Sequence, residues 1–199
     1  MPSKIFGILA VVGMIGLTAC TTSLKESWLD PSVTSEIHFK KVVVAVLSPN
    51  PTVRRAAEDA LVARIKRTEA VPSYSLFSES EIKDRDRVKA RLLEAGVDGV
   101  VVMRLIGVNQ QTTWVPGAYP QPYYNMPSYW GYANTAVYDP GYMRTDTIAQ
   151  METNIYSVAD EKLIYAARSE TFNPGDAVTL VNDIAKAIAA DLKKRGVLK

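Results

Sequence analysis

The sequence predicts a single α/β domain built on a mixed sheet. Short apolar runs rich in β-branched residues alternate with segments of helical periodicity, which is typical of this class. Two further strand patterns and a last helix follow a long intervening segment. A chain of 199 residues with 47% hydrophobic and 22% charged residues suits one ordinary globular domain. The expected order of elements is β-α-β-α-β-(long loop)-β-β-α.

The start of the chain has the pattern of an export signal. One cation, Lys4, precedes an uncharged apolar run from Ile5 to Leu17. This run is too short for a membrane span, which needs about 20 residues, and has the length of a signal-peptide core. Leu17-Thr18-Ala19-Cys20 then resembles the lipobox of bacterial lipoproteins. The alternatives are a conventional signal peptide with a chance cysteine and a buried apolar helix.

The lipobox resemblance implies removal of residues 1–19 as a lipoprotein signal peptide and acylation of Cys20, for instance with palmitate. Cys20 is the only cysteine of the chain, so no intramolecular disulfide is expected. Acyl chains on Cys20 make the membrane the first predicted partner. In Gram-negative lipoproteins an Asp after the cysteine favours retention in the inner membrane. Thr21 at that position therefore implies the periplasmic face of the outer membrane.

The segment after the signal peptide, residues 20–40, is polar and is expected to be the lipidated cysteine followed by an irregular tether. The α/β domain is expected over residues 41–199. Trp28 stands out in the tether. We expect its ring to fill a groove on the domain and so to fix the tether, with a partner-binding epitope as the alternative.

The first half of the domain shows three elements. Lys41 to Leu47 is nearly all apolar and predicts a strand buried on both faces. Asn50 and Pro51 then suit the N-cap and the first position of a helix that runs to about Arg67. Val71 to Phe77 is a second strand candidate, weakened by Pro72.

The remaining elements follow from caps and periodicity. Ser78-Glu79-Ser80-Glu81 fits a capping box, and the helix after it, irregular near Asp84, is expected to stop at Gly96. The last helix is expected to begin at an Asp176 cap and to end near Arg195 and Gly196. Three further strands complete the sheet, the last two of them as a hairpin: Asp98–Val108, Arg144–Val158 and Lys162–Phe172.

An aromatic loop is expected at about residues 109–142. No residue from Leu105 to Tyr138 is charged, and Trp114 to Tyr142 holds seven tyrosines, two tryptophans, five prolines and three glycines. Such a loop is either mobile and of low complexity or a binding surface for protein, glycan, peptidoglycan or the membrane interface. The candidate partner-binding residues are Trp114, Tyr123, Tyr124, Tyr129, Trp130 and Tyr132.

The residues that support catalysis are scarce. His38 is the only histidine, and the only thiol is in the lipobox, so no zinc site is expected. The sequence has no glycine-rich phosphate loop and no nucleophile elbow. The formal net charge of +2 leaves no polybasic footprint for nucleic acid. We therefore expect no catalytic residue, no metal and no cofactor.

The ordered motifs resemble a group of uncharacterised proteobacterial lipoproteins. These motifs are Trp28-Leu29-Asp30-Pro31, Phe39-Lys40-Lys41-Val42-Val43-Val44, Arg55 with Glu58-Asp59, Pro72-Ser73-Tyr74 and Ala95-Gly96-Val97-Asp98-Gly99-Val100. More distantly, the order of elements is similar to the small α/β domain of CsgG, to LpoB and to the amino-terminal domain of TolB. The resemblance implies an envelope binding or assembly module without enzymatic activity, with an envelope protein or peptidoglycan as a possible partner. The alternative is an envelope glycan or peptidoglycan hydrolase that uses carboxylates.

Overall fold

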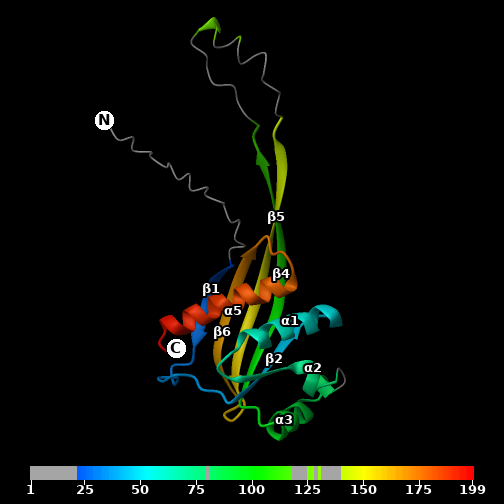
Figure 1. The fold of residues 1–199 in the computed structure, drawn as a ribbon, viewed down its shortest axis with the longest axis vertical. Helices are drawn as coiled ribbons and strands as arrows, with labels where there is room; N and C mark the ends of the chain where they lie inside the picture. Colours follow the sequence, from blue (N-terminus) through cyan, green and yellow to red (C-terminus); the bar gives the residue numbers. More distant parts are fainter. Residues whose placement is uncertain (1–21, 79–80, 118–124, 128–129, 131–139) are drawn as a thin grey trace, which may run out of the picture.

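The computed structural model shows one six-stranded mixed sheet with helices on both faces, which confirms the predicted class (Figure 1). The structure describes residues 22–78, 81–117, 125–127, 130 and 140–199. The strand order across the sheet is β1-β6-β5-β4-β2-β3. The β2–β3 and β2–β4 pairs are parallel, whereas the β4–β5, β5–β6 and β1–β6 pairs are antiparallel. The strands are β1 (Thr22–Leu29), β2 (Lys41–Leu47), β3 (Glu69–Pro72), β4 (Gly99–Val115), β5 (Tyr142–Ser157) and β6 (Lys162–Phe172).

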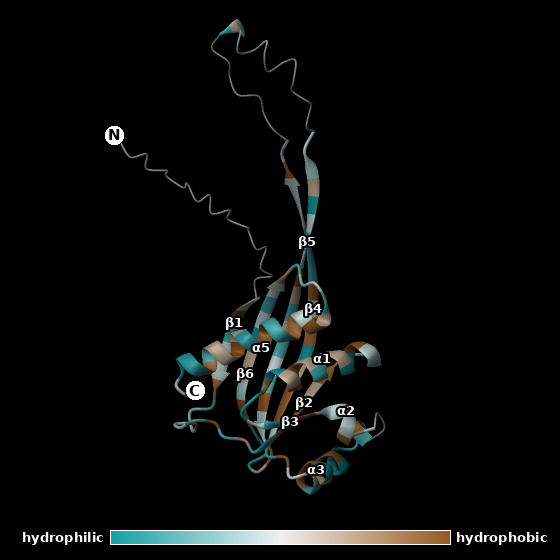
Figure 2. Ribbon diagram, in the orientation of Figure 1, coloured by the Kyte–Doolittle hydropathy of each residue, from teal (hydrophilic) through white to brown (hydrophobic). Residues whose placement is uncertain are grey.

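The two long helices, α1 (Pro51–Arg64) and α5 (Ala177–Lys194), cover one face of the sheet. α2 (Ser73–Leu76) and α3 (Arg85–Glu94) pack on the opposite face, against Val43 of β2. A 3₁₀ turn, η1 (Glu81–Lys83), precedes α3. Hydrophobic residues concentrate in the strands and helices of this body (Figure 2). The sheet therefore has a main core under α1 and α5 and a smaller core under α2 and α3.

The local signals of the sequence are confirmed at the helix ends. Asn50 Oδ1 accepts hydrogen bonds from the amides of Thr52 at 3.0 Å and Val53 at 3.2 Å. Asp176 caps α5 by accepting from the Thr179 amide at 2.7 Å. Gly96 and Gly196 end α3 and α5 with φ of +68° and +77°, in the left-handed region that glycine adopts without steric cost.

The segment expected to be an irregular tether contains strand β1. Thr22 to Leu29 pairs antiparallel with β6, and the Thr22 and Thr171 hydroxyls are 2.8 Å apart. Trp28 therefore lies in a strand opposite Ala166 and remains 45% exposed. Leu24 and Leu29 pack against the main core. These apolar contacts and the free edge of β6 explain why this polar segment joins the sheet.

Two expectations in the first half of the domain are corrected. α1 ends at Arg64, three residues before the expected end, because Ile65 takes extended backbone angles that lead into β3. The strand expected over Val71–Phe77 ends at Pro72, which has no amide hydrogen for a ladder, and α2 follows. The capping box is confirmed, since Glu81 accepts from the Ser78 amide at 2.9 Å. The capping box lies at the start of η1 rather than of α3. Asp84 is the N-cap residue of α3.

A buried tyrosine joins α5 to the sheet. The Tyr165 hydroxyl donates to Asp191 Oδ2 at 2.9 Å, and Arg195 Nε donates to the same oxygen at 2.9 Å. Arg195 Nη2 also donates to Ser27 Oγ of β1 at 2.7 Å. Burial, with the hydrogen bond to Asp191 as the second cause, raises the pKa of Tyr165 well above its usual value.

We expect Tyr165→Phe to flatten the alkaline loss of stability. The folded state holds the Tyr165 proton more tightly than the unfolded chain, so its contribution is complete below about pH 10 and declines as the pH rises further. At neutral pH the variant should lose about 1 kcal/mol with the hydrogen bond. Urea unfolding at pH 7 and pH 11 measures both effects. The half-buried Tyr156 offers the control Tyr156→Phe, and parallel pH profiles for Tyr165→Phe and wild type would contradict the assignment.

Candidate functional site

The hairpin of β4 and β5 extends well beyond the other strands of the sheet (Figure 1). Its ladder continues to the Val115–Tyr142 pair, so the loop expected at about 109–142 is shorter than predicted at both ends. Uncharged cross-strand pairs contribute to this extension, such as Thr112 and Thr145, whose hydroxyl oxygens are 3.2 Å apart. Among the described residues of this extension, one ion pair is present, between Arg144 and Asp146 of β5 at 3.0 Å.

The described aromatic residues of the hairpin present large exposed surfaces. Trp114 is 53% exposed at the end of β4, and Trp130 is 66% exposed in the segment between the strands. The ring of Trp114 also covers Gly141, where an added Cβ would lie 2.8 Å from Cζ2. Trp114 thus has a structural role as well as an exposed face. The other candidate residues, Tyr123, Tyr124, Tyr129 and Tyr132, lie outside the described residues, as does Cys20.

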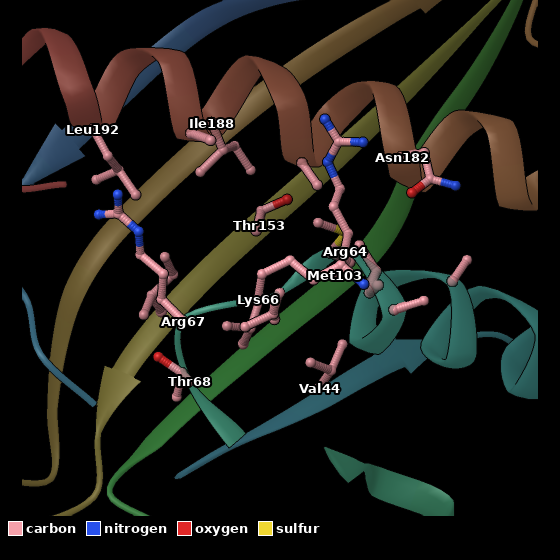
Figure 3. Close-up of a pocket in the computed structure, with 18 of the residues that line it drawn as sticks. Val44, Arg64, Lys66, Arg67, Thr68, Met103, Thr153, Asn182, Ile188 and Leu192 are labelled. Atoms are coloured by element: carbon pink, nitrogen blue, oxygen red, sulfur yellow. The ribbon is translucent and has the colours of Figure 1, made fainter. Parts of the chain in front are cut away.

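A second surface, which the sequence did not predict, is a groove between α1 and α5 of about 960 Å³ (Figure 3). Small side chains line it on both helices, Ala60 and Ala63 on α1 and Ala185 and Ala189 on α5. Large side chains at these positions would fill the space between two packed helices. Strand residues form part of the lining: Val44, Val101, Met103, Thr153 and Ile155.

The side chains that line this groove include cations and no carboxylate. Arg64, Lys66, Arg67 and Lys199 are the charged members. Glu36 lies nearby and pairs with Lys199 at 2.9 Å and with Arg67 at 4.0 Å. Within the part of the chain that the structure describes, Arg64 and Lys66 form no ion pair. The groove therefore combines an apolar interior with two cationic side chains, Arg64 and Lys66, that no described carboxylate pairs.

Thr153 supplies a polar atom to the same groove. Its side chain is 1% exposed, and its hydroxyl has no hydrogen-bond partner in the structure. The oxygen projects from β5 into the space under α5 (Figure 3). A buried hydroxyl without a partner costs free energy and is uncommon in folded proteins. Strand alternation alone does not distinguish Thr153 from an ordinary core threonine, so the sequence held no signal for it.

Several motif residues of the lipoprotein resemblance form one structural cluster. Glu58 is fully buried, and its Oε1 accepts from the Val46 amide at 3.0 Å, Arg54 Nε at 3.0 Å and Ser73 Oγ at 2.7 Å. Its Oε2 accepts from the Tyr74 amide at 3.2 Å. Glu58 therefore ties α1 to β2 and α2.

The exposed neighbours of this cluster extend the same contact. The Tyr74 hydroxyl donates to Asp59 Oδ1 at 2.5 Å, and this hydrogen bond is the main cause that raises the pKa of Tyr74. The Arg55 guanidinium lies 5.4 Å from the centroid of the Tyr74 ring. Asp98, in another motif, accepts from the amides of Lys40 and Lys41 at 2.8 and 3.0 Å. These motif residues thus hold elements together.

Two smaller hollows contain carboxylates, and each of these has a structural partner. Trp28 lines the first, where Glu152 accepts from Arg104 at 2.7 Å and from Asn154 at 2.8 Å. These bonds, the one from Arg104 first, lower the pKa of Glu152. Arg104 is thus paired on an exposed face of the sheet. In the second hollow the Lys199 hydrogen bond lowers the pKa of Glu36.

Two further observations concern metal binding and membrane spanning. Among the described residues, His, Cys, Asp and Glu form no group of three that could hold a metal ion. In that same part of the chain, every helix is too short or too polar to cross a bilayer.

Comparison with known proteins shows similarity at the level of broad architecture. No family model matches the chain, and no curated protein matches it. Among solved structures, the PelC dodecamer from Paraburkholderia phytofirmans is 10% identical with a TM-score of 0.44, covering 84% of this chain and 95% of that chain. Lipoprotein GNA1162 from Neisseria meningitidis is 10% identical with a TM-score of 0.40, covering 77% and 98%. At these values function has to be argued from the chain's own residues.

Proposed function

We propose that the protein is a lipoprotein, anchored through Cys20 to the periplasmic face of the outer membrane, that acts as a non-enzymatic binding or assembly module of the cell envelope. The anchor rests on the lipobox pattern at Leu17-Thr18-Ala19-Cys20. Strand β1 begins at Thr22, two residues after Cys20. Two residues span at most about 7 Å, so a lipid on Cys20 would hold the sheet close to the bilayer surface.

The observation that carries the proposal is that Thr22, where β1 begins, and the hairpin lie at the same end of the sheet. Thr22 pairs with Thr171, Thr171 pairs with Ala149, and Ala149 pairs with Val108. From Val108, β4 continues for seven residues to Val115. This part of the strand extends about 23 Å beyond the end of the sheet at which Thr22 pairs. The hairpin therefore extends past Thr22, toward the side on which an anchor on Cys20 would place the membrane.

This geometry favours a partner at the membrane surface. Exposed tryptophans such as Trp114 and Trp130 are the side chains on which interface energy concentrates. Peptidoglycan would meet the opposite end of an anchored domain more readily than the hairpin. The proposed partner is accordingly an envelope protein held at the membrane, bound through the aromatic hairpin.

The alternative of a carboxylate hydrolase has less support. A general acid at neutral pH needs a raised carboxyl pKa, produced by burial or by a neighbouring negative charge. Glu36 and Glu152, in the two small hollows, have lowered pKa values because cations bind them. The large groove has no carboxylate side chain in its lining. Neither the carboxylates of the small hollows nor the lining of the large groove therefore resembles a catalytic acid–base pair.

Cys20→Ala is the direct test of the anchor. In a Gram-negative host, the variant should lose incorporation of labelled palmitate and should accumulate as an unprocessed or released form, since the acylated sulfur is gone. Thr21→Asp should instead keep the lipid and move the protein to the inner-membrane fraction of a sucrose gradient. Thr21→Ser is the matched control and should behave as wild type. Equal palmitate labelling of Cys20→Ala and wild type would rule the anchor out.

A further inference from the structure

The groove between α1 and α5 has the dimensions of an acyl-chain site. The residues of α5 that line it recur at helical spacing from Val178 to Leu192. Fourteen residues of helix span about 21 Å. A single membrane leaflet, half of a hydrocarbon core of about 30 Å, is about 15 Å deep. A groove of this length and of about 960 Å³ accommodates one long acyl chain.

The chemistry of the lining selects an anionic amphiphile. The floor of the groove is apolar and buried, with Met103 and Ile155 on the strands and Ile188 on α5. Arg64, Lys66 and Arg67 lie around the space in Figure 3, and no carboxylate side chain opposes them in the lining. Among these three cations, Arg67 already pairs with Glu36, whereas a neutral or cationic amphiphile would leave Arg64 and Lys66 without a counterion within the described residues.

Thr153 indicates an oxygen in the ligand. Its hydroxyl lies buried at the floor of the groove without a partner, so it can donate one hydrogen bond to an acceptor that reaches the floor. A plain hydrocarbon chain offers no acceptor, whereas the ester carbonyl of an acyl glycerol does. A lipid with an apolar chain, an ester carbonyl and a phosphate has a group for each part of the groove: the apolar floor, the Thr153 hydroxyl and the cations.

We propose that the groove binds an anionic lipid with one acyl chain and a phosphate-bearing head, of the monoacyl glycerophospholipid class. The chain lies along α5 over the strands, Thr153 donates to the ester carbonyl, and Arg64, Lys66 and Arg67 bind the phosphate. This site is separate from the hairpin and does not depend on the partner proposed for it.

The test is photo-crosslinking of the purified protein, kept free of detergent, with a diazirine-bearing 1-oleoyl lysophosphatidylglycerol. Labelled peptides should come from α1, β5 and α5. Ala189→Phe, which fills the groove, should abolish labelling, and the matched control Ala190→Phe, on the exposed neighbouring position, should not change it. Arg64→Ala with Arg67→Ala should weaken labelling about tenfold or more, as expected for lost charge-assisted hydrogen bonds.

Competition separates the possible ligands. Unlabelled lysophosphatidylglycerol should compete, whereas lysophosphatidylcholine with the same chain should need about a tenfold higher concentration because its head has no net charge. Equal competition by the two lipids would show that the head is not recognised and would overturn the proposal. Equal competition by glycerol phosphate would overturn it too, since only the rim would then bind.

If Ala189→Phe fails to fold, a second variant still tests whether the groove binds the lipid. Thr153→Val keeps the shape of the floor and removes the donor, and it should weaken labelling severalfold without lowering the melting temperature. Labelling of a folded Ala189→Phe at the wild-type level, or unchanged labelling of Thr153→Val, would contradict the site as described.

Discussion

Replacing Glu58 with alanine is expected to lower the free energy of unfolding by about 3–5 kcal/mol, the usual cost of breaking a buried ion pair from one side. The Glu58 side chain is fully buried and binds Arg54, whose side chain is only 14% exposed. The variant leaves that guanidinium, the Ser73 hydroxyl and the Val46 amide without their acceptor. A loss of this size is a large part of the total stability of a typical domain.

The next residue provides a matched control. Asp59→Asn removes a carboxylate from the same helix, but Asp59 makes only one described hydrogen bond, to the exposed Tyr74 hydroxyl. Its cost should stay below about 1 kcal/mol. Urea unfolding followed by circular dichroism compares the two variants at equal pH and salt. A Glu58→Ala protein within 1 kcal/mol of wild type would show that this cluster does not stabilise the fold.

Elements with local signals could be predicted from the sequence, because caps and periodicity lie within a few residues of each other. The Asn50 cap, the Asp176 cap and the apolar stripe of α5 belong to this group. The β5–β6 hairpin was predicted for the same reason, as its strands are joined by a short turn. In each case the interactions that define the element are short-range along the chain.

Strand β1 could not be predicted, because its stabilising contacts are remote. Thr22 pairs with Thr171, 149 positions away. The segment itself reads as polar and lacks a clean alternation. Its strand state therefore depends on the free edge of β6, which only the assembled sheet provides. The end of β3 at Pro72 has a similar origin, since Glu58 on α1 binds the Ser73 hydroxyl and the Tyr74 amide.

The candidate sites also depend on contacts between segments that are remote in the sequence, so the sequence could not predict them. Ala185 belongs to an apolar stripe that predicts core packing, yet in the structure it lines a groove that small residues of α1 also line. The relation between α1 and α5 is tertiary and is absent from either helix alone. The hairpin extension was missed because Gln110 to Thr113 is polar and uncharged, which reads as a loop, whereas the ladder with β5 needs only backbone groups.

Shortening the hairpin is expected to abolish partner capture and to leave the fold intact. Val115 and Tyr142 face each other at the end of the ladder, so residues 116–141 can be replaced by Asn-Gly, the preferred two-residue turn. The body should keep both cores, since neither cluster includes any of the residues of that segment that the structure describes. The melting temperature should therefore change by only a few degrees. Cross-linking from the intact envelope, followed by identification of captured proteins, should lose the partner found with wild type.

Single substitutions sharpen this test. Trp130→Ala should weaken capture by about 2 kcal/mol, or about thirtyfold, if Trp130 is an interface anchor. Trp28→Ala is the matched control, because Trp28 is also an exposed tryptophan, at 45%, but lies on β1 in the body of the sheet. It should leave capture unchanged. An unchanged set of captured proteins after hairpin replacement would remove the hairpin as the partner surface, and a collapsed melting temperature would place its aromatic residues in the core instead.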